Sequence, residues 1–257
     1  MSNGSRDKMV LALVAVRLKS TRLKRKALLD LGGQPLVLQL TRRLRQARAP
    51  HRVIWCTSTH REDDDLATLA QQHGIECFRG SELDVMSRFL AVADKYRAGT
   101  VVRVTGDNPL TDPLMMDCMI ESHLAAGAEY SFNDELPRGT RSEIMDVDAL
   151  RRCHALVHDP NASEYMTLMI KRPDHFKVHR VTAPGPEWVR PELRLTIDTP
   201  EDYALMKAIY EHFAGEPPSL PRIIAFLDTQ PQLRDGNQHV KVKDLDDSIN
   251  VRLKGDA

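Results

Sequence analysis

Short apolar runs of strand length alternate with segments of helical spacing through the first half of the chain. The apolar runs cover residues 10–16, 52–56, 75–78 and 100–104. Between and after them, hydrophobic positions recur every three or four residues, which is the spacing of an amphipathic helix. The helices predicted in this way cover residues 36–49, 62–73, 84–98 and 115–126. Because strands and helices alternate, we predict an α/β fold with a mostly parallel sheet flanked by helices.

The pattern changes after residue 128. Shorter strand-like segments cover residues 130–133, 140–147 and 176–181, and predicted helices cover residues 147–158 and 162–171. The buried-strand pattern resumes at residues 194–197, before predicted helices at 201–214 and 220–228 and a polar tail at 237–257. We therefore expect an α/β core formed by residues 1–128 and 195–257, and a smaller α+β insertion or lid formed by residues 129–194.

A basic stretch follows the first apolar run. It carries six cations within ten positions, together with Ser20 and Thr21: Arg17, Lys19, Arg22, Lys24, Arg25 and Lys26. Ligands of parallel sheets bind outside the carboxyl ends of the strands, which is where this stretch lies. A triphosphate would supply the counter-charge that crowded cations need. The alternative is a solvated loop whose charges face water.

Two aspartates follow predicted strands in the same way. Asp107 comes directly after residues 101–106, and Asp198 comes directly after residues 193–197. Two carboxylates at neighbouring strand ends can hold Mg²⁺, which prefers oxygen ligands. Gly106 would also let a ligand approach the backbone. The alternative is that each aspartate caps the helix that follows it.

Composition and the absence of other motifs narrow the function. The chain has 257 residues, 42% of them hydrophobic, and a formal net charge of zero, so it is not built as a whole to bind nucleic acid or an anionic membrane. Its four cysteines form no CxxC pair, which argues against a zinc site or a disulfide framework. It has no secretory signal and no apolar run of about 20 residues, so we expect a cytoplasmic protein. The sequence also lacks the P-loop, the dinucleotide GxGxxG, the hydrolase GxSxG and the HExxH motifs.

Three segments carry a family resemblance: ALVAVRLKSTRLKRK, VVRVTGDNPLTDP and LRLTIDTPEDYALMKAIY. Their order and content resemble the CMP-sugar synthetases, a cytidylyltransferase family that includes the acylneuraminate and CMP-KDO synthetases. The resemblance is greatest to the spore-coat polysaccharide branch and extends from about residue 10 to residue 254, through the DDSIN segment at residues 246–250.

The resemblance implies a Rossmann-like fold of the nucleotide-diphospho-sugar transferase type. It implies an enzyme that transfers CMP from CTP to a sugar acid, of the 2-keto-3-deoxy or nonulosonate type, with release of pyrophosphate in surface polysaccharide biosynthesis. Mg²⁺ would be the cofactor. Residues 129–194 would bind the sugar and carry the interface of a homodimer.

The resemblance also implies roles for individual residues. The catalytic residues would be Arg17, Arg22, Lys26 and Asp107. The nucleotide would contact these four and also Ser20, Thr57, Ser58, Arg79 and Ser87. Asp107 and Asp198 would hold the metal. The sugar would contact Arg138, Glu143 and Tyr165.

Two positions depart from the family pattern. Lys24-Arg25 stands where relatives usually have Pro-Gly, and Tyr165 stands where relatives often have His. Since a tyrosine with a pKa near 10 is no base at neutral pH, sugar specificity or activity could differ. Two alternatives stay open: a nucleotidylyltransferase that uses another nucleotide or a sugar phosphate or phosphonate acceptor, and a catalytically silent nucleotide-binding relative.

Overall fold

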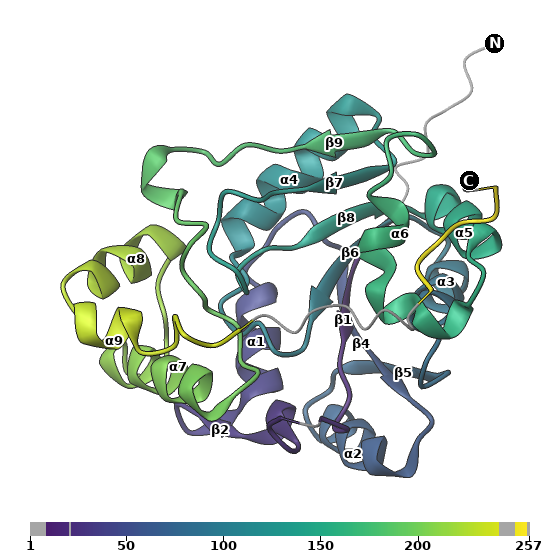
Figure 1. Ribbon diagram of the computed structural model, residues 1–257. Coiled ribbons are helices and arrows are strands. Elements are labelled where there is room, and N and C mark those ends of the chain that lie inside the picture. The colour runs from purple at the N-terminus through teal and green to yellow at the C-terminus, as the bar shows by residue number, and fades with distance from the viewer. Residues whose placement is uncertain (1–8, 21, 242–249, 256–257) are drawn as a thin grey trace.

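The computed structural model describes residues 9–20, 22–241 and 250–255, and a seven-stranded sheet forms its centre (Figure 1). In spatial order the strands are β5 (Glu76–Gly80), β4 (Arg52–Ser58), β1 (Met9–Ala15), β6 (Ala98–Thr105), β8 (Glu143–Asp146), β7 (Tyr130–Phe132) and β9 (Val178–Arg180). The first four are parallel, β8 is antiparallel to both of its neighbours, and β9 is parallel to β7. The predicted mostly parallel sheet is confirmed.

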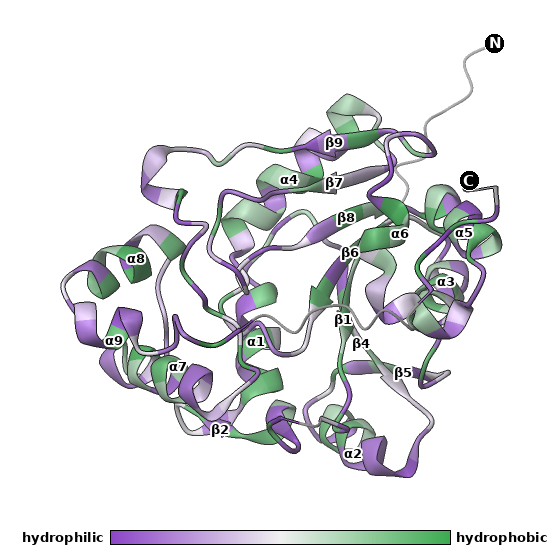
Figure 2. Ribbon diagram, in the orientation of Figure 1, coloured by the Kyte–Doolittle hydropathy of each residue, from purple (hydrophilic) through white to green (hydrophobic). Residues whose placement is uncertain are grey.

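Strand β1 lies between β4 and β6 and is buried on both faces. Leu11 and Leu13 point to one hydrophobic cluster, while Val10, Ala12 and Val14 point to the other. This two-sided burial explains why the sequence shows a continuous apolar run here rather than alternation. Figure 2 shows the same concentration of hydrophobic residues in the central strands.

Helices cover both faces of the sheet. One hydrophobic cluster includes residues of α1 (Leu36–Leu44), α2 (Asp64–Gln72), α4 (Pro113–Ala126), α7 (Pro200–His212) and α8 (Leu220–Asp228). The other includes residues of α3 (Val85–Tyr96), α5 (Val147–Leu156) and α6 (Met166–Ile170). A short hairpin of β2 (Asp30–Leu31) and β3 (Gln34–Pro35) precedes α1, and α9 (Pro231–Asp235) follows α8. The predicted helices on both faces are confirmed.

The segment 129–194 does not form a sheet of its own. Its strands β7, β8 and β9 extend the central sheet beyond β6. The predicted helix at 162–171 is divided into the 3₁₀ helix η3 (Pro160–Tyr165) and α6. That this segment acts as a lid over a sugar stays a prediction.

The predicted strand at residues 194–197 is wrong. The segment is extended and buried, but its regular pairing is limited to a single bridge between Arg194 and Arg138. Its backbone hydrogen bonds go to loops instead, because Leu195 donates to the carbonyl of Arg138 and Ile197 donates to the carbonyl of Asp107. Residues 194–197 therefore have the apolar sequence of a buried strand, but in the structure they connect two loops.

The end of the chain returns to α5, where Leu253 forms a bridge with Val157. Thr21, Val242 and most of the DDSIN segment lie outside the described residues. Within the described part of the chain, no helix has both the length and the apolar character needed to cross a membrane.

Candidate active site

The two predicted metal-binding acids converge on one lysine. Lys26 Nζ lies 2.7 Å from Asp107 Oδ2 and 2.8 Å from Asp198 Oδ1, although the three residues are far apart in the sequence. Lys26 begins the 3₁₀ helix η1 (Lys26–Leu28), Asp107 follows β6 and Asp198 precedes α7. The structure thus brings three of the predicted site residues together at the carboxyl end of the sheet.

Backbone contacts hold the two acids in place. Gly106 donates its N–H to the carbonyl of Ala15, at 2.9 Å, and Ile197 donates to the carbonyl of Asp107, at 3.0 Å. A Cβ on Gly106 would lie 2.7 Å from the side chain of Val16, so this glycine is required by the neighbouring loop rather than by an approaching ligand. The end of β6 is therefore fixed between β1 and the segment that carries Asp198.

Neither aspartate caps a helix. The N-cap of α7 is Thr199, whose hydroxyl accepts from Asp202 N while the Asp202 carboxylate accepts from Thr199 N. The N-cap of α4 is Asp112. The capping alternative is thus wrong for both acids, and their carboxylates are turned toward Lys26.

Charges within the site stabilise one another. Burial disfavours a charged lysine, but the carboxylates of Asp107 and Asp198 outweigh it and raise the pKa of Lys26 above its usual value. Burial likewise opposes ionisation of Asp198, yet Lys26, Arg22 and Arg194 together lower its pKa. Lys26 is therefore held as a cation, and the Asp198 carboxylate beside it is held in its ionised form.

A supporting network behind Asp198 was missed by the sequence analysis. Arg194 donates from Nε and Nη2 to the two oxygens of Asp202, each at 2.8 Å, and also from Nη2 to Asp198 at 3.1 Å. Asn237 donates to Asp202 Oδ1 at 2.8 Å. The signal for Asp202 was the capping box, which places an acid three residues after Thr199. Nothing in the sequence indicated that Asn237 would reach it.

The other cations of the basic stretch also face carboxylates. Arg22 lies 3.2 Å from Asp198. The remaining ion pairs join Arg17 to Glu164, Lys19 to Glu82 and Arg25 to Asp65. The stretch is therefore not simply a solvated loop, since five of its six cations have a carboxylate partner from a distant part of the chain.

The buried Asp63 ties the start of this stretch to the end of β4. Its carboxylate accepts from Leu18 N at 2.7 Å and from Ser58 N at 3.2 Å, and it also accepts from the Ser58 hydroxyl. From the sequence, Asp63 is predicted only as a first-turn residue of the helix at 62–73. An acid in the first turn of a helix is common, so the sequence does not show that Asp63 also binds Leu18 and Ser58.

The residues predicted to contact the nucleotide differ in whether their side chains already form hydrogen bonds within the protein. Thr57 Oγ1 is buried and has no hydrogen-bond partner among the residues that the structure describes, and Ser20 is half-buried in the basic stretch. Ser87 donates its hydroxyl to the carbonyl of Asp84, at 2.9 Å. Arg79 donates to the carbonyl of Ser58, at 2.9 Å. Ser58 and Ser87 thus use their hydroxyl protons within the protein, whereas the Thr57 hydroxyl keeps hydrogen-bonding capacity within the described part of the chain.

The predicted sugar contacts are not gathered at one point. Burial and the charge of Arg194 lower the pKa of Arg138. The carboxylates of Asp198 and Asp107 act in the opposite direction, so the Arg138 guanidinium is close enough to interact electrostatically with both acids. Glu143 instead accepts from Arg103, Tyr130 and Thr167. Tyr165 ends η3, directly after the Glu164 that binds Arg17.

Arg25 stands in a backbone conformation that favours glycine. Its φ is +53°, in the left-handed region, at the position where the family resemblance leads us to expect Gly. A side chain there costs about 1 kcal/mol. We therefore expect Arg25→Gly to raise the free energy of unfolding by about 0.5–1 kcal/mol. This value already includes the small cost of losing the exposed Arg25–Asp65 ion pair. Urea denaturation measures this.

Lys24→Gly is the matched control, because Lys24 is not among the residues with positive φ. It should be neutral or slightly destabilising. A loss of stability in Arg25→Gly equal to that in Lys24→Gly would show that the left-handed backbone stores no strain.

The donor set at Asp107 and Asp198 fits a divalent cation. The two carboxylates already share one positive group, the ammonium of Lys26. Among the described residues, no group of three or more His, Cys, Asp and Glu side chains could hold a metal ion. A pair of carboxylates suits Mg²⁺, which is commonly bound by one or two carboxylates together with substrate phosphates.

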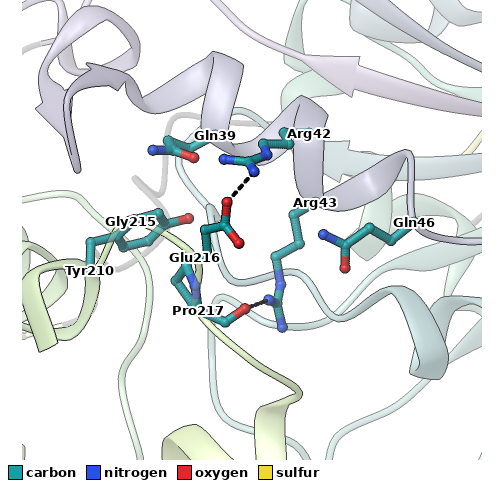
Figure 3. A pocket seen from close by; sticks show the side chains of 8 residues that line it. All are labelled: Gln39, Arg42, Arg43, Gln46, Tyr210, Gly215, Glu216 and Pro217. Atoms are coloured by element: carbon teal, nitrogen blue, oxygen red, sulfur yellow. Dashed lines mark hydrogen bonds and ion pairs between the residues drawn. The ribbon is translucent and has the colours of Figure 1, made fainter. Parts of the chain in front are cut away.

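A separate hollow lies beside α1 (Figure 3). Its arginines are already engaged, since Arg42 pairs with Glu216 and Arg43 donates to the carbonyl of Pro217 at 2.7 Å. None of the predicted site residues lines it. We therefore assign the site to the convergence of Lys26, Asp107 and Asp198.

The sequence profile of the cytidylyltransferases matches residues 11–216, which is most of the chain. The chain belongs to the cytidylyltransferase family. Family membership places this cytidylyltransferase among the nucleotidyltransferases. It is 34% identical over 232 residues to the spore coat polysaccharide biosynthesis protein SpsF of Bacillus subtilis, a match that covers 86% of this chain and 95% of SpsF.

Two solved structures share the fold of this cytidylyltransferase. A cytidylyltransferase from Leptospira borgpetersenii has a TM-score of 0.79 at 25% identity, with 92% of this chain and 98% of that chain covered. A CMP:2-keto-3-deoxy-manno-octonic acid synthetase, solved in complex with CTP, has a TM-score of 0.62 at 17% identity, with 80% and 100% covered. The Rossmann-like fold predicted from the sequence is confirmed.

Proposed function

We propose that this cytidylyltransferase transfers CMP from CTP to a sugar acid of the 2-keto-3-deoxy or nonulosonate type and releases pyrophosphate. The observation that carries the proposal is the convergence of Asp107, Asp198 and Lys26 beside the basic stretch. Two carboxylates suit Mg²⁺, and the surrounding cations suit a triphosphate. The match to the family profile supports the same chemistry.

In the proposed reaction, a hydroxyl oxygen of the acceptor bonds to the α-phosphorus of CTP and loses its proton to solvent. The bond from that phosphorus to the β-phosphate oxygen breaks, and pyrophosphate leaves with those electrons. Mg²⁺ bound by Asp107 and Asp198 would lower the pKa of the hydroxyl and offset charge at the phosphorus. Arg17 and Arg22, now paired with Glu164 and Asp198, would donate to phosphate oxygens, which are strong acceptors for a guanidinium. Lys26 would offset charge on the leaving pyrophosphate.

The acceptor would lie against residues 129–194, which would also carry a homodimer interface. The electrostatic reach of Arg138 to Asp107 and Asp198 supports this side of the site for the acceptor. The name of SpsF supports a role in polysaccharide biosynthesis, and the octonic acid synthetase supports a sugar-acid acceptor. A cytoplasmic enzyme without a membrane or nucleic-acid partner completes the proposal.

The test measures pyrophosphate release with each of the four nucleoside triphosphates, Mg²⁺ and a panel of 2-keto-3-deoxy sugar acids. We expect release with CTP and a sugar acid, and none after EDTA treatment. Release with another nucleotide only, or with a sugar phosphate or phosphonate only, would contradict the corresponding part of the proposal. Calorimetric binding of CTP with Mg²⁺, without turnover on any acceptor, would identify a catalytically silent nucleotide-binding protein.

A further inference from the structure

Arg88 on α3 is a buried cation that has no carboxylate partner in the described part of the chain. Only 3% of its surface is exposed. Its one hydrogen bond within the described residues runs from Nη1 to the carbonyl of Cys56, at 3.1 Å. Its Nε is also buried, and none of residues 9–20, 22–241 and 250–255 offers it an acceptor. Since a buried charge is normally paired and fully hydrogen-bonded, this arginine calls for an additional acceptor.

Another buried arginine of comparable exposure, Arg43, shows what a structural role looks like. Arg43 on α1 pairs with Asp112 at 3.2 Å and donates to two backbone carbonyls. Two acids, Asp63 and Asp84, act on Arg88 through their charge, but their hydrogen bonds go elsewhere. Asp63 accepts from Leu18 and Ser58, and Asp84 accepts from Ser87. Arg88 therefore lacks the internal compensation that Arg43 has.

The guanidinium of Arg88 lies where three parallel strands end. The Cys56 carbonyl that it contacts also accepts from Val16 N, just after β1. Its aliphatic stem crosses Gly80 at the end of β5, where a Cβ would lie 2.8 Å from Arg88 Cγ. Burial, reinforced by the charge of Arg17, lowers the pKa of Arg88. The side chain thus forms part of the floor at the carboxyl ends of β1, β4 and β5.

Sheet order separates this point from the metal-binding acids. Asp107 follows β6, on one side of β1, whereas Cys56 and Gly80 belong to β4 and β5, on the other side. Neighbouring strands lie about 4.8 Å apart, so the two points are separated by roughly 10 Å or more across the sheet. If the reacting phosphate lies at Asp107, the opposite end of the nucleotide, its base, extends toward Arg88.

We propose that Arg88 reads the pyrimidine base, by donating from Nε and Nη2 to O2 and N3 of cytosine. These two nitrogens form one edge of the guanidinium fork, and neither has a partner among the described residues. Cytosine presents two adjacent acceptors, O2 and N3, whereas uracil presents a donor at N3. An arginine fork can therefore bind the cytosine edge and not the uracil edge, in the same way that arginine binds the two adjacent acceptors O6 and N7 of guanine. The inference rests on the proposed function, because it assumes a nucleotide at this site.

The test compares binding of CTP, UTP, 3-deaza-CTP and inorganic tripolyphosphate by calorimetry. 3-Deaza-CTP keeps the shape of CTP but replaces N3 by a C–H group. For the unmodified protein we expect CTP to bind about tenfold or more tightly than UTP or 3-deaza-CTP. For Arg88→Met and Arg88→Lys we expect that preference to fall below about threefold, with tripolyphosphate affinity unchanged.

Two matched variants separate base recognition from other effects. Arg43→Met removes an arginine of similar burial that lines the hollow beside α1, where no predicted site residue lies, and it should keep the preference for CTP. Lys26→Met should weaken CTP, UTP and tripolyphosphate alike. A folded Arg88→Met protein that keeps the preference, or that loses tripolyphosphate as strongly as CTP, would overturn the assignment.

The affinities of the unmodified protein for these ligands give a test that does not depend on the folding of any variant. Equal affinity for CTP and 3-deaza-CTP would overturn the role of Arg88 while leaving the proposed function standing. Failure of every nucleoside triphosphate to bind more tightly than tripolyphosphate would instead contradict the proposed function itself, and the assignment of Arg88 with it.

Discussion

Replacing Asp107 by Asn is expected to slow pyrophosphate release from CTP by about 100-fold or more, because divalent metal ions contribute several kcal/mol to phosphoryl chemistry. Asn has nearly the shape of Asp, and the bond from Ile197 N to the carbonyl of residue 107 is unaffected. The fold should therefore remain. Turnover is measured with saturating CTP and acceptor, and folding is measured by thermal denaturation.

Asp94→Asn is the matched control for this variant. Asp94 is an exposed acid near the far end of α3, where it pairs with Arg151 at 2.7 Å. An exposed pair contributes little, so both turnover and melting temperature should stay near those of the unmodified protein. A turnover number in Asp107→Asn equal to that in Asp94→Asn would refute the role of Asp107.

Replacing Gly139 by Ala is expected to destabilise the chain by about 3 kcal/mol and to remove activity as well. Gly139 has a φ of +94°, and a Cβ there would lie 2.4 Å from the backbone of Leu195 and Thr196. Backbone atoms cannot turn aside as a flexible side chain can, so the segment leading to Asp198 would be displaced. Urea denaturation and CTP turnover report the two effects.

Gly33→Ala separates the clash from the strain of a positive φ. Gly33 has a φ of +84°, but no atom lies within 4 Å of a Cβ built there. This variant should lose about 1 kcal/mol and keep its activity. Equal stability and equal turnover in Gly139→Ala and Gly33→Ala would show that the contact with residues 195–196 does not position Asp198.

The parallel half of the fold was predictable because each of its elements is encoded locally. Strands buried on both faces produce continuous apolar runs, as in β1 and β4. The position of Asp107 after β6 also follows from local sequence, since a strand end in a parallel sheet is a ligand-binding position. The observed boundaries of these parallel strands differ from the predicted ones by at most two residues, so the assignments stand.

Contacts between distant segments could not be predicted in the same way. The extended residues 194–197 have the burial of a strand but bond to loops, and periodicity does not distinguish the two. Arg88 resembled any other polar position of an amphipathic helix until its neighbours were known. Asp63 likewise gained its role from Leu18 and Ser58, which meet it only in the folded chain.

The most direct test of the site is anomalous diffraction from crystals that contain CTP and Mn²⁺. We expect a manganese peak within ligand distance of carboxylate oxygens of both Asp107 and Asp198, with the triphosphate beside the basic stretch at residues 17–26. A peak elsewhere, or a triphosphate bound away from these two acids, would contradict it.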